Sequence, residues 1–273
     1  MTRIKPVNLG PFRGINNRLP DFALHSDAGD FLRSALNADV DDAGRLRRRI
    51  GQTRIQALSA PHSLYKTTDG RFFVVIGSVL YRITLPAYTQ AIVKVLSANS
   101  RVHYAEHNGD VYYSNGTDSG RISGSNTLYP WALPTPALPA VATIAGALPA
   151  GKYLIAVTYS NSDTGEEGGA QGSTQYALSA PGAMRVTLPE AVTGATHVNV
   201  YVSAINGEVP CLHGSVAAGT VSYDVTTPTT TRVCATIGLE PLPAGVGLFT
   251  HLGRLGVISA GVVFYSEPWR LGY

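Results

Sequence analysis

The sequence predicts an all-β protein in which a β-meander domain is split by an inserted β-sandwich. A short phrase, glycine, spacer, valine, large apolar residue and tyrosine, occurs three times, starting at Gly77, Gly109 and Gly261. Charged residues make up only 14% of the chain, while glycine and proline number 29 and 17. Glycine permits tight turns, and β-branched and aromatic residues suit strands. The low charge indicates a large surface that is buried or covered by a partner.

Residues 1–60 have little periodicity and predict an extended N-terminal arm that contains an arginine-rich hairpin. Apolar residues alternate over 36–40, Asp42-Ala43-Gly44 is a turn signal, and Leu46 resumes the pattern. The hairpin strand that follows the turn is basic. Its candidate contacts with DNA or with a neighbouring subunit are Arg45, Arg47, Arg48 and Arg49, together with Arg54.

Two interpretations of these arginines stay open. In a strand, alternate side chains point to one face, so Arg45, Arg47 and Arg49 are predicted to share a face and Arg48 to lie on the other. They could contact phosphates through charge alone, without reading bases. Alternatively, they form a solvated surface paired with nearby aspartates. No aromatic residues are interleaved with them as stacking platforms.

Residues 61–132 predict the first part of the meander domain. Strands are expected over 63–66, 72–76, 79–83, 91–96, 101–105 and 111–114. The turn signals are Asp69-Gly70, Gly77-Ser78 and Asn108-Gly109, and Asn-Gly between β-rich runs is a strong hairpin signal. Strands at this spacing with a repeated aromatic motif are typical of propeller blades or a related meander, although the repeat is shorter than the ~40–45 residues of a blade.

Residues 133–244 predict an inserted domain of another kind. It is preceded by a proline-rich linker around 130–139, and alternating apolar residues then recur over 153–159, 184–188 and 198–202. Short strands of this kind are typical of an immunoglobulin-like or fibronectin-type sandwich. The net charge also changes sign between the N-terminal arm and the inserted domain. Residues 1–54 carry ten Lys/Arg against six Asp/Glu, net +4, whereas residues 131–244 carry three against seven, net −4.

Residues 245–273 return to the pattern of the first meander segment. Apolar alternation resumes near Leu248, and the third copy of the motif follows at Gly261. Two or three blades cannot close a propeller. The sequence therefore predicts either a wall shared between several chains or a sheet assembly smaller than a propeller.

The sandwich offers the second set of candidate contacts. An acidic loop over 163–169 is expected to lie exposed at one end of the domain. Tyrosines on the neighbouring strands could join it in binding a partner or receptor. The candidate residues are Asp163, Glu166, Glu167, Tyr159, Tyr176 and Tyr201.

The sequence contains no pattern of an enzyme or of a cofactor site. It has no Gly-x-Ser-x-Gly elbow, no phosphate-binding Gly-Lys-Ser/Thr loop and no metal-ligand spacing. We therefore expect no catalysis, no cofactor and no metal. Cys211 and Cys234 are expected to be free, partly buried thiols. No run of apolar residues is long enough for a membrane span, and the N-terminus lacks the apolar segment of a signal peptide.

Two blocks of sequence resemble virion proteins of tailed bacteriophages. The first comprises residues 8–16, residues 35–40 and the arginine block over 42–51; the second comprises Gly253-Arg254-Leu255 and Tyr265-Ser266-Glu267-Pro268-Trp269. They are similar to tail tubular (nozzle) proteins and packaged-DNA stabilisation proteins of short-tailed phages. The two blocks together cover about a quarter of the chain. Nozzle proteins continue well beyond the second block, which is a departure from the pattern.

This resemblance implies a structural tail or head–tail component. It would assemble as a homo-oligomeric ring around the DNA channel, take part in DNA ejection, contact other tail proteins and touch genomic DNA without sequence preference. The expected location is the phage tail, after assembly in the host cytoplasm. The alternative is a tail-tip or fibre-attachment module whose sandwich binds a host-surface receptor or glycan.

Overall fold

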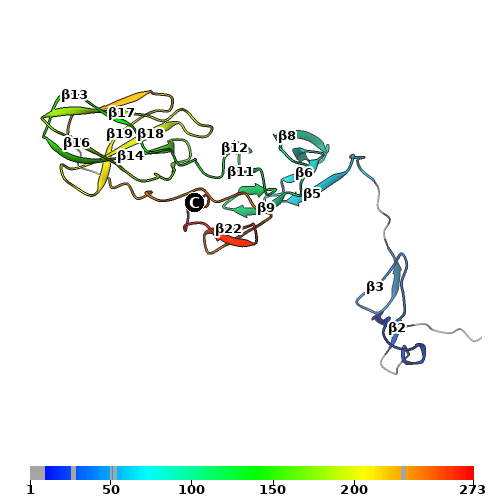
Figure 1. The fold of residues 1–273 in the computed structure, drawn as a ribbon. Coiled ribbons are helices and arrows are strands. Elements are labelled where there is room, and N and C mark those ends of the chain that lie inside the picture. The colour runs from blue at the N-terminus through cyan, green and yellow to red at the C-terminus, as the bar shows by residue number, and fades with distance from the viewer. Residues whose placement is uncertain (1–9, 26–28, 50, 52–53, 229–231) are drawn as a thin grey trace, which may run out of the picture. The chain divides into compact units, whose positions relative to one another are not determined.

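The computed structural model describes residues 10–25, 29–49, 51, 54–228 and 232–273. The predicted fold class is confirmed at the level of an all-β chain, with 49% strand and 1% helix arranged in several antiparallel sheets. The chain divides into two compact units, residues 1–57 and 58–273 (Figure 1). Within the described residues, no helix has the length and apolar character needed to cross a membrane.

The N-terminal unit contains two small sheets. Strands β1 (Phe12–Ile15) and β2 (Asp30–Leu32) pair in parallel, with a single 3-10 turn, η1 (Asp21–Ala23), between them. Strands β3 (Ala38–Val40) and β4 (Leu46–Arg48) form the predicted antiparallel hairpin. Leu24 is the only buried apolar residue among those described in this unit, so its strands have almost no core of their own.

Three antiparallel meander sheets form much of the second unit, and we call them the first, central and last sheets. The first is β5 (Pro61–Lys66), β6 (Phe72–Ile76), β7 (Val79–Thr84) and β8 (Thr89–Val95); the central is β9 (His103–His107), β10 (Asp110–Ser114), β11 (Ser119–Ile122) and β12 (Leu128–Tyr129); the last is β21 (Gly247–His251), β22 (Arg254–Ser259) and β23 (Val262–Tyr265).

The three copies of the repeated motif supply β7, β10 and β23, one strand to each meander sheet. Each copy begins with a glycine in the left-handed region, with φ of +61° at Gly77, +82° at Gly109 and +77° at Gly261. These are turn positions that only glycine adopts without strain, which is why the motif starts with it.

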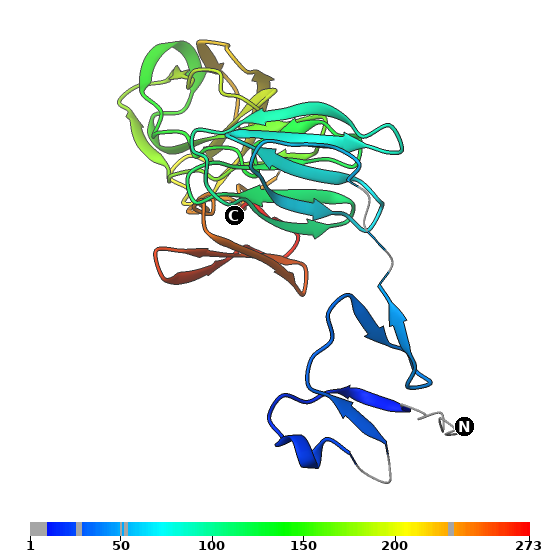
Figure 2. The ribbon, with the colours of Figure 1, turned by 90° about the vertical axis from the view of Figure 1, so that its right-hand side faces the viewer.

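The central sheet lies between the other two, and apolar side chains on both of its faces form cores (Figure 2). One face packs against the first sheet through Val111, Tyr113 and Ile122, which meet Phe73 and Leu80. The residues between them in sequence point to the opposite face, because side chains alternate along a strand. That face, which includes Ala105 and Tyr112, packs against Leu255 and Val257 of the last sheet.

In sequence, two further sheets come between the central and last sheets, and these two sheets pack face to face. The first contains β13 (Val141–Leu148), β17 (Gly182–Thr187) and β20 (Ser222–Val225); the second contains β14 (Gly151–Asn161), β15 (Glu166–Glu167), β16 (Thr174–Leu178), β18 (His197–Ser203) and β19 (Pro210–Ala217). Their shared core holds the alternating apolar residues expected from the sequence, among them Ile155, Val157, Met184, Val186 and Val200.

The segments that lead into and out of this two-sheet region lie side by side. The Trp131 indole N–H donates to the Leu242 carbonyl at 3.2 Å, and Thr135 Oγ1 donates to the Leu239 carbonyl at 3.2 Å. The Leu242 N–H in turn donates to the Gly272 carbonyl at 2.8 Å. The C-terminal residues therefore hold both connecting segments together.

Candidate functional site

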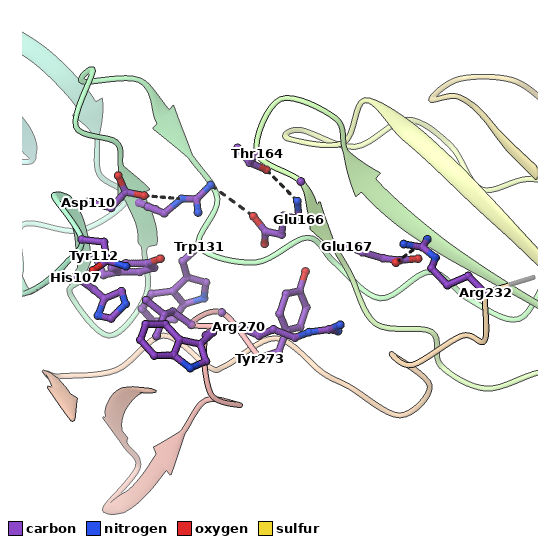
Figure 3. Close-up of a pocket in the computed structure, with 16 residues that line it drawn as sticks. His107, Asp110, Tyr112, Trp131, Thr164, Glu166, Glu167, Arg232, Arg270 and Tyr273 are labelled. Atoms are coloured by element: carbon purple, nitrogen blue, oxygen red, sulfur yellow. Dashed lines mark hydrogen bonds and ion pairs between the residues drawn. The ribbon is translucent and has the colours of Figure 1, made fainter. Parts of the chain in front are cut away.

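A polar cavity of about 480 Å³ lies where the central sheet, the β14–β15 turn and the C-terminal segment meet (Figure 3). The central sheet provides Asp110, Tyr112 and Arg121, and the turn provides Thr164 to Glu167. Trp131 and the C-terminal segment close the remaining sides. The cavity therefore combines carboxylates, arginines and aromatic rings that lie far apart in the sequence.

Arg121 is the central charge of this cavity. Its guanidinium lies 3.7 Å from an Asp110 carboxylate oxygen and 3.5 Å from a Glu166 carboxylate oxygen, both long ion pairs. Among the described residues, its buried Nε has no hydrogen-bond partner. Burial raises the pKa of the Glu166 carboxyl above its usual value, although the charge of Arg121 acts in the opposite direction. The network is thus incompletely satisfied.

Glu167, the next residue, points to a different and fully satisfied environment. Its carboxylate accepts hydrogen bonds from Thr158 Oγ1 at 2.7 Å, from Asn199 Nδ2 at 2.9 Å and from the Tyr201 hydroxyl. Arg232 adds an ion pair at 3.1 Å. Because a buried carboxylate is tolerated when it is paired and hydrogen-bonded, this arrangement is structural.

Trp269 stands at the mouth of the cavity and is 73% exposed. Its φ of +62° lies in the left-handed region, which costs a bulky residue strain. The indole lies against the imidazole of His107, with 5.6 Å between ring centroids, and the backbone N–H of Trp269 donates to the Gly253 carbonyl at 2.9 Å. An exposed indole held in this way can act as an aromatic platform for a ligand.

The structure does not bring the predicted partner contacts of the sandwich together on one surface. Tyr159 is buried in the core between the two sheets and donates to the Glu190 carbonyl at 2.7 Å. Tyr201 is buried on the opposite face of its sheet, so neither tyrosine can reach a partner from this conformation. Tyr176 is half-buried, with its hydroxyl 2.7 Å from Thr143 Oγ1, and Asp163 alone is exposed.

The arginine hairpin of the N-terminal unit contains ion pairs between candidate arginines and nearby aspartates. Arg45 and Arg47 pair with Asp41 at 3.0 and 2.8 Å, and Arg49 pairs with Asp39 at 2.8 Å. Hydrogen bonding from the Arg45 backbone N–H is the main cause that holds the pKa of the Asp41 carboxyl below its usual value. Three of the five candidate arginines therefore face aspartates of their own hairpin.

The other two arginines are placed differently. Arg48 and Arg54 are exposed, and neither forms an ion pair with any residue that the structure describes. They remain the cations of this segment that are available to an external phosphate or carboxylate. Asn8, Leu9 and Ile50, which belong to the resemblance blocks, lie outside the described residues.

The outer face of the first sheet, which we call the first face, is apolar on three of its strands, β6 to β8. It belongs to none of the four apolar cores found among the described residues, although Val74 at its centre is only 2% exposed. Ile92 and Val95 on the edge strand are 67% and 63% exposed. By strand pairing and alternation, the apolar residues of the first face are Phe72, Val74, Ile76, Val79, Tyr81, Ile83, Ile92 and Val95, and the polar residues Lys66 and Gln90 lie on the same face.

The outer face of the last sheet, which we call the last face, is apolar as well. Gly256 faces outward at its centre and is covered by the ring of Phe249. The exposed apolar residues of the last face are Phe249 at 44%, Ile258 at 39%, Val263 at 55% and Tyr265 at 69%. The two outermost meander sheets thus both present apolar side chains to their surroundings.

No protein-family model matches the chain, and no curated protein sequence matches it. The features of the molecule that bear on its function are the arginine hairpin, the polar cavity and the two apolar faces.

Sequence reasoning did not single out Arg121 or Tyr273, and it named Trp269 only as part of the second resemblance block. Arg121 is an isolated arginine in a short strand, and Trp269 and Tyr273 follow the last strand as single aromatic residues. None of them belongs to a periodic pattern or a motif of fixed spacing. The first face could have been found from sequence, because β6 and β7 are apolar at nearly every position, as expected for strands with two covered faces.

Proposed function

We propose that this chain is a structural protein of a tailed-bacteriophage virion, a tail nozzle, tail tube or head–tail component that assembles as a homo-oligomeric ring around the DNA channel. The observation that carries the assembly role is the first face, a sheet surface of eight apolar residues with an exposed edge strand. Ile92 and Val95 are exposed, Val74 is buried, and the other five residues are partly exposed. A contiguous apolar surface of this kind marks an interaction site when it is large.

The phage assignment is supported by the two resembling sequence blocks and by where they lie. The first block includes the arginine hairpin, and the second includes the start of β22, the end of β23 and Trp269. In the proposed arrangement, the three meander sheets are blades of a propeller-like wall, and residues 133–244 are an immunoglobulin- or fibronectin-like domain inserted in it. Arg48 and Arg54 provide positive charge for DNA or for a neighbouring subunit.

Cryo-EM of particles from the phage that encodes this chain tests the proposal. A ring of copies around the channel, into which the three meander sheets can be built, is the expected result. Mass spectrometry of the same purified particles gives an independent readout. If the protein is absent from intact, infectious particles, the virion assignment fails, whatever the protein does in isolation.

A second candidate is a tail-tip or attachment module that binds a host-surface glycan. It is favoured by one specific observation, the exposed Trp269 beside a cavity with carboxylates and arginines. Glycan-array binding by the purified chain, compared with Trp269→Ala, tests it. Leu128→Ala, an apolar position 36% exposed that does not line the cavity, is the control. Binding that Trp269→Ala leaves unchanged contradicts this function.

A further inference from the structure

The first and last faces are the two ends of one stack of sheets. The central sheet occupies the middle, with the first sheet on one of its faces and the last sheet on the other. The first and last faces each point away from the central sheet. They cannot meet each other within one chain, because the central sheet lies between them (Figure 2).

The contacts inside the stack show what kind of element packs against the face of a meander sheet. In both internal contacts of the stack, two meander sheets contribute apolar side chains. At the contact between the central and last sheets, the connecting and C-terminal segments also contribute Trp131, Ala132, Leu242, Leu271 and Tyr273. Phe73, Val75 and Leu80 of the first sheet meet one face of the central sheet in this way. Covering an apolar sheet face removes apolar surface from water and is therefore favourable. A further sheet of the same kind is therefore the occupant that the packing favours.

We propose that the first face of one copy packs against the last face of the next copy, so that the stack continues from chain to chain. The proposal rests on the assembly role proposed above and specifies its contact surfaces. Because the two faces are different, the contact is heterologous, and it forms a ring when the rotation between copies closes. Each copy then contributes three sheets to a continuous wall.

The cations of the two faces lie away from the centres of those faces. On the first face, Lys66 lies at the edge, with its ammonium 5.9 Å from the centre of the Phe72 ring. On the last face, the Arg254 guanidinium lies 5.4 Å from the centre of the Tyr265 ring. Both cations fold back over aromatic rings of their own sheets. Val74 and Gly256 occupy the centres of the two faces, so no ionic group is buried where the two faces would meet.

Mixing two proteins that each carry one engineered surface cysteine tests the pairing directly. Cys211, which is half-exposed, is first changed to serine, and buried Cys234 is left in place. Ile92→Cys then marks the first face, and Val263→Cys marks the last face. Under mild oxidation, the mixture of the two variants is expected to form disulfide-linked dimers that contain one of each. Either variant alone is expected to stay monomeric on a non-reducing gel.

Charge substitutions give the second readout. Ile92→Lys and Val263→Lys each place an ammonium in the proposed contact and are expected to weaken self-association at least about tenfold in analytical ultracentrifugation. Val221→Lys, at a position 77% exposed in the two-sheet region, is the matched control and should change nothing. Circular dichroism checks that all three variants fold.

The outcomes separate this inference from the proposed function. The head-to-tail contact is overturned if the wild-type protein remains monomeric across the concentration range. It is also overturned if the disulfide-linked dimers in the mixture contain two copies of one variant and not one of each. Dimers that survive both lysine substitutions point to another occupant, such as the exposed edge of β23 pairing with a strand, and also overturn it. If the virion contains a ring of this protein that is built through other surfaces, the proposed function holds and the head-to-tail contact does not.

Discussion

The Tyr273 hydroxyl and the Leu133 backbone form a reciprocal pair of hydrogen bonds across 140 residues of sequence. The hydroxyl accepts from the Leu133 N–H at 2.6 Å and donates to the Leu133 carbonyl at 3.0 Å. Both groups are buried, and burial raises the pKa of the Tyr273 hydroxyl, so it remains protonated and able to donate. One phenol thus satisfies both polar groups of the residue at which the chain enters the two-sheet region.

Removing this hydroxyl should destabilise the second unit. Tyr273→Phe leaves a buried N–H and carbonyl of Leu133 without partners, at a cost of about 1–3 kcal/mol in the free energy of unfolding. Urea denaturation followed by fluorescence measures it. Tyr176→Phe removes a hydroxyl hydrogen bond at a more exposed site and should cost less. Equal losses in the two variants contradict the role given to the Tyr273–Leu133 pair.

Glu166 should make stability depend on pH in an uncommon direction for a carboxyl group. Its pKa is raised in the folded state, so its contribution is fully present below the unfolded pKa and is lost as the pH rises through the folded pKa. Glu166→Gln mimics the protonated form, and its melting temperature should exceed the wild-type value at neutral pH. The difference should shrink on acidification. A destabilised variant at neutral pH shows that the Arg121 ion pair outweighs the cost of burial.

Asp69 should show the opposite dependence. Hydrogen bonds from Thr67 and then from Arg71 lower the pKa of its carboxyl to about 2. Arg71 also donates to the carbonyls of Ser123, at 2.7 Å, and Gly109, so Asp69 orients a side chain that bridges the first and central sheets. Its contribution is present above the unfolded pKa and is lost as the pH falls toward about 2.

Asp69→Asn should therefore lower the melting temperature at neutral pH by more than it does near pH 2. Thermal melts across this range measure the difference. Asp163→Asn, which removes an exposed carboxylate from the β14–β15 turn, is the control and should show little pH-dependent change. A constant difference between Asp69→Asn and wild type at every pH contradicts the linkage.

The turn between β22 and β23 should accept a stabilising substitution. Ala260 and Gly261 have φ of +48° and +77°, close to +50° and +82° at Asn108 and Gly109 in the β9–β10 turn. Asparagine tolerates this conformation better than alanine. Ala260→Asn is expected to stabilise the protein by about 1 kcal/mol or less, and Asn108→Ala to destabilise it by a similar amount. Two changes of the same sign contradict the turn assignment.

DNA binding by the arginine hairpin should depend on Arg48 and Arg54. Changing both to glutamine should reduce the slope of log affinity against log salt by about 0.9 for each phosphate that is no longer neutralised. Changing Arg45 and Arg47 removes the same charge from residues already paired with Asp41 and should have a smaller effect. Fluorescence anisotropy with duplex DNA gives both slopes. Equal effects mean that net charge alone matters.

Local sequence predicted much of the secondary structure correctly. The turns at Gly77, Asn108-Gly109 and Asp42-Ala43-Gly44 fall where they were expected, and the apolar alternation over 153–159 points into a core. These features depend on residues within one turn or one strand. Sequence alone could therefore reveal them, because the required φ angles and side-chain periodicity are local properties.

The sites were less accessible to sequence reasoning. Tyr159 and Tyr201 are tyrosines on neighbouring strands, yet strand alternation and pairing bury them on opposite faces of one sheet. The acidic stretch looked like one exposed loop, but Glu166 meets Arg121 and Glu167 meets Tyr201. Which side chain meets which depends on sheet packing, and no spacing in the sequence encodes it.

The sequence by itself determined an all-β chain, the positions of its tight turns and the faces of its strands. Only the tertiary structure decided that the central sheet separates two apolar end faces, that three arginines form ion pairs with two aspartates, and that Tyr273 reaches Leu133. The reason is physical. Turn angles and alternation act over a few residues, whereas burial and hydrogen-bond satisfaction depend on contacts between segments that lie far apart in the chain.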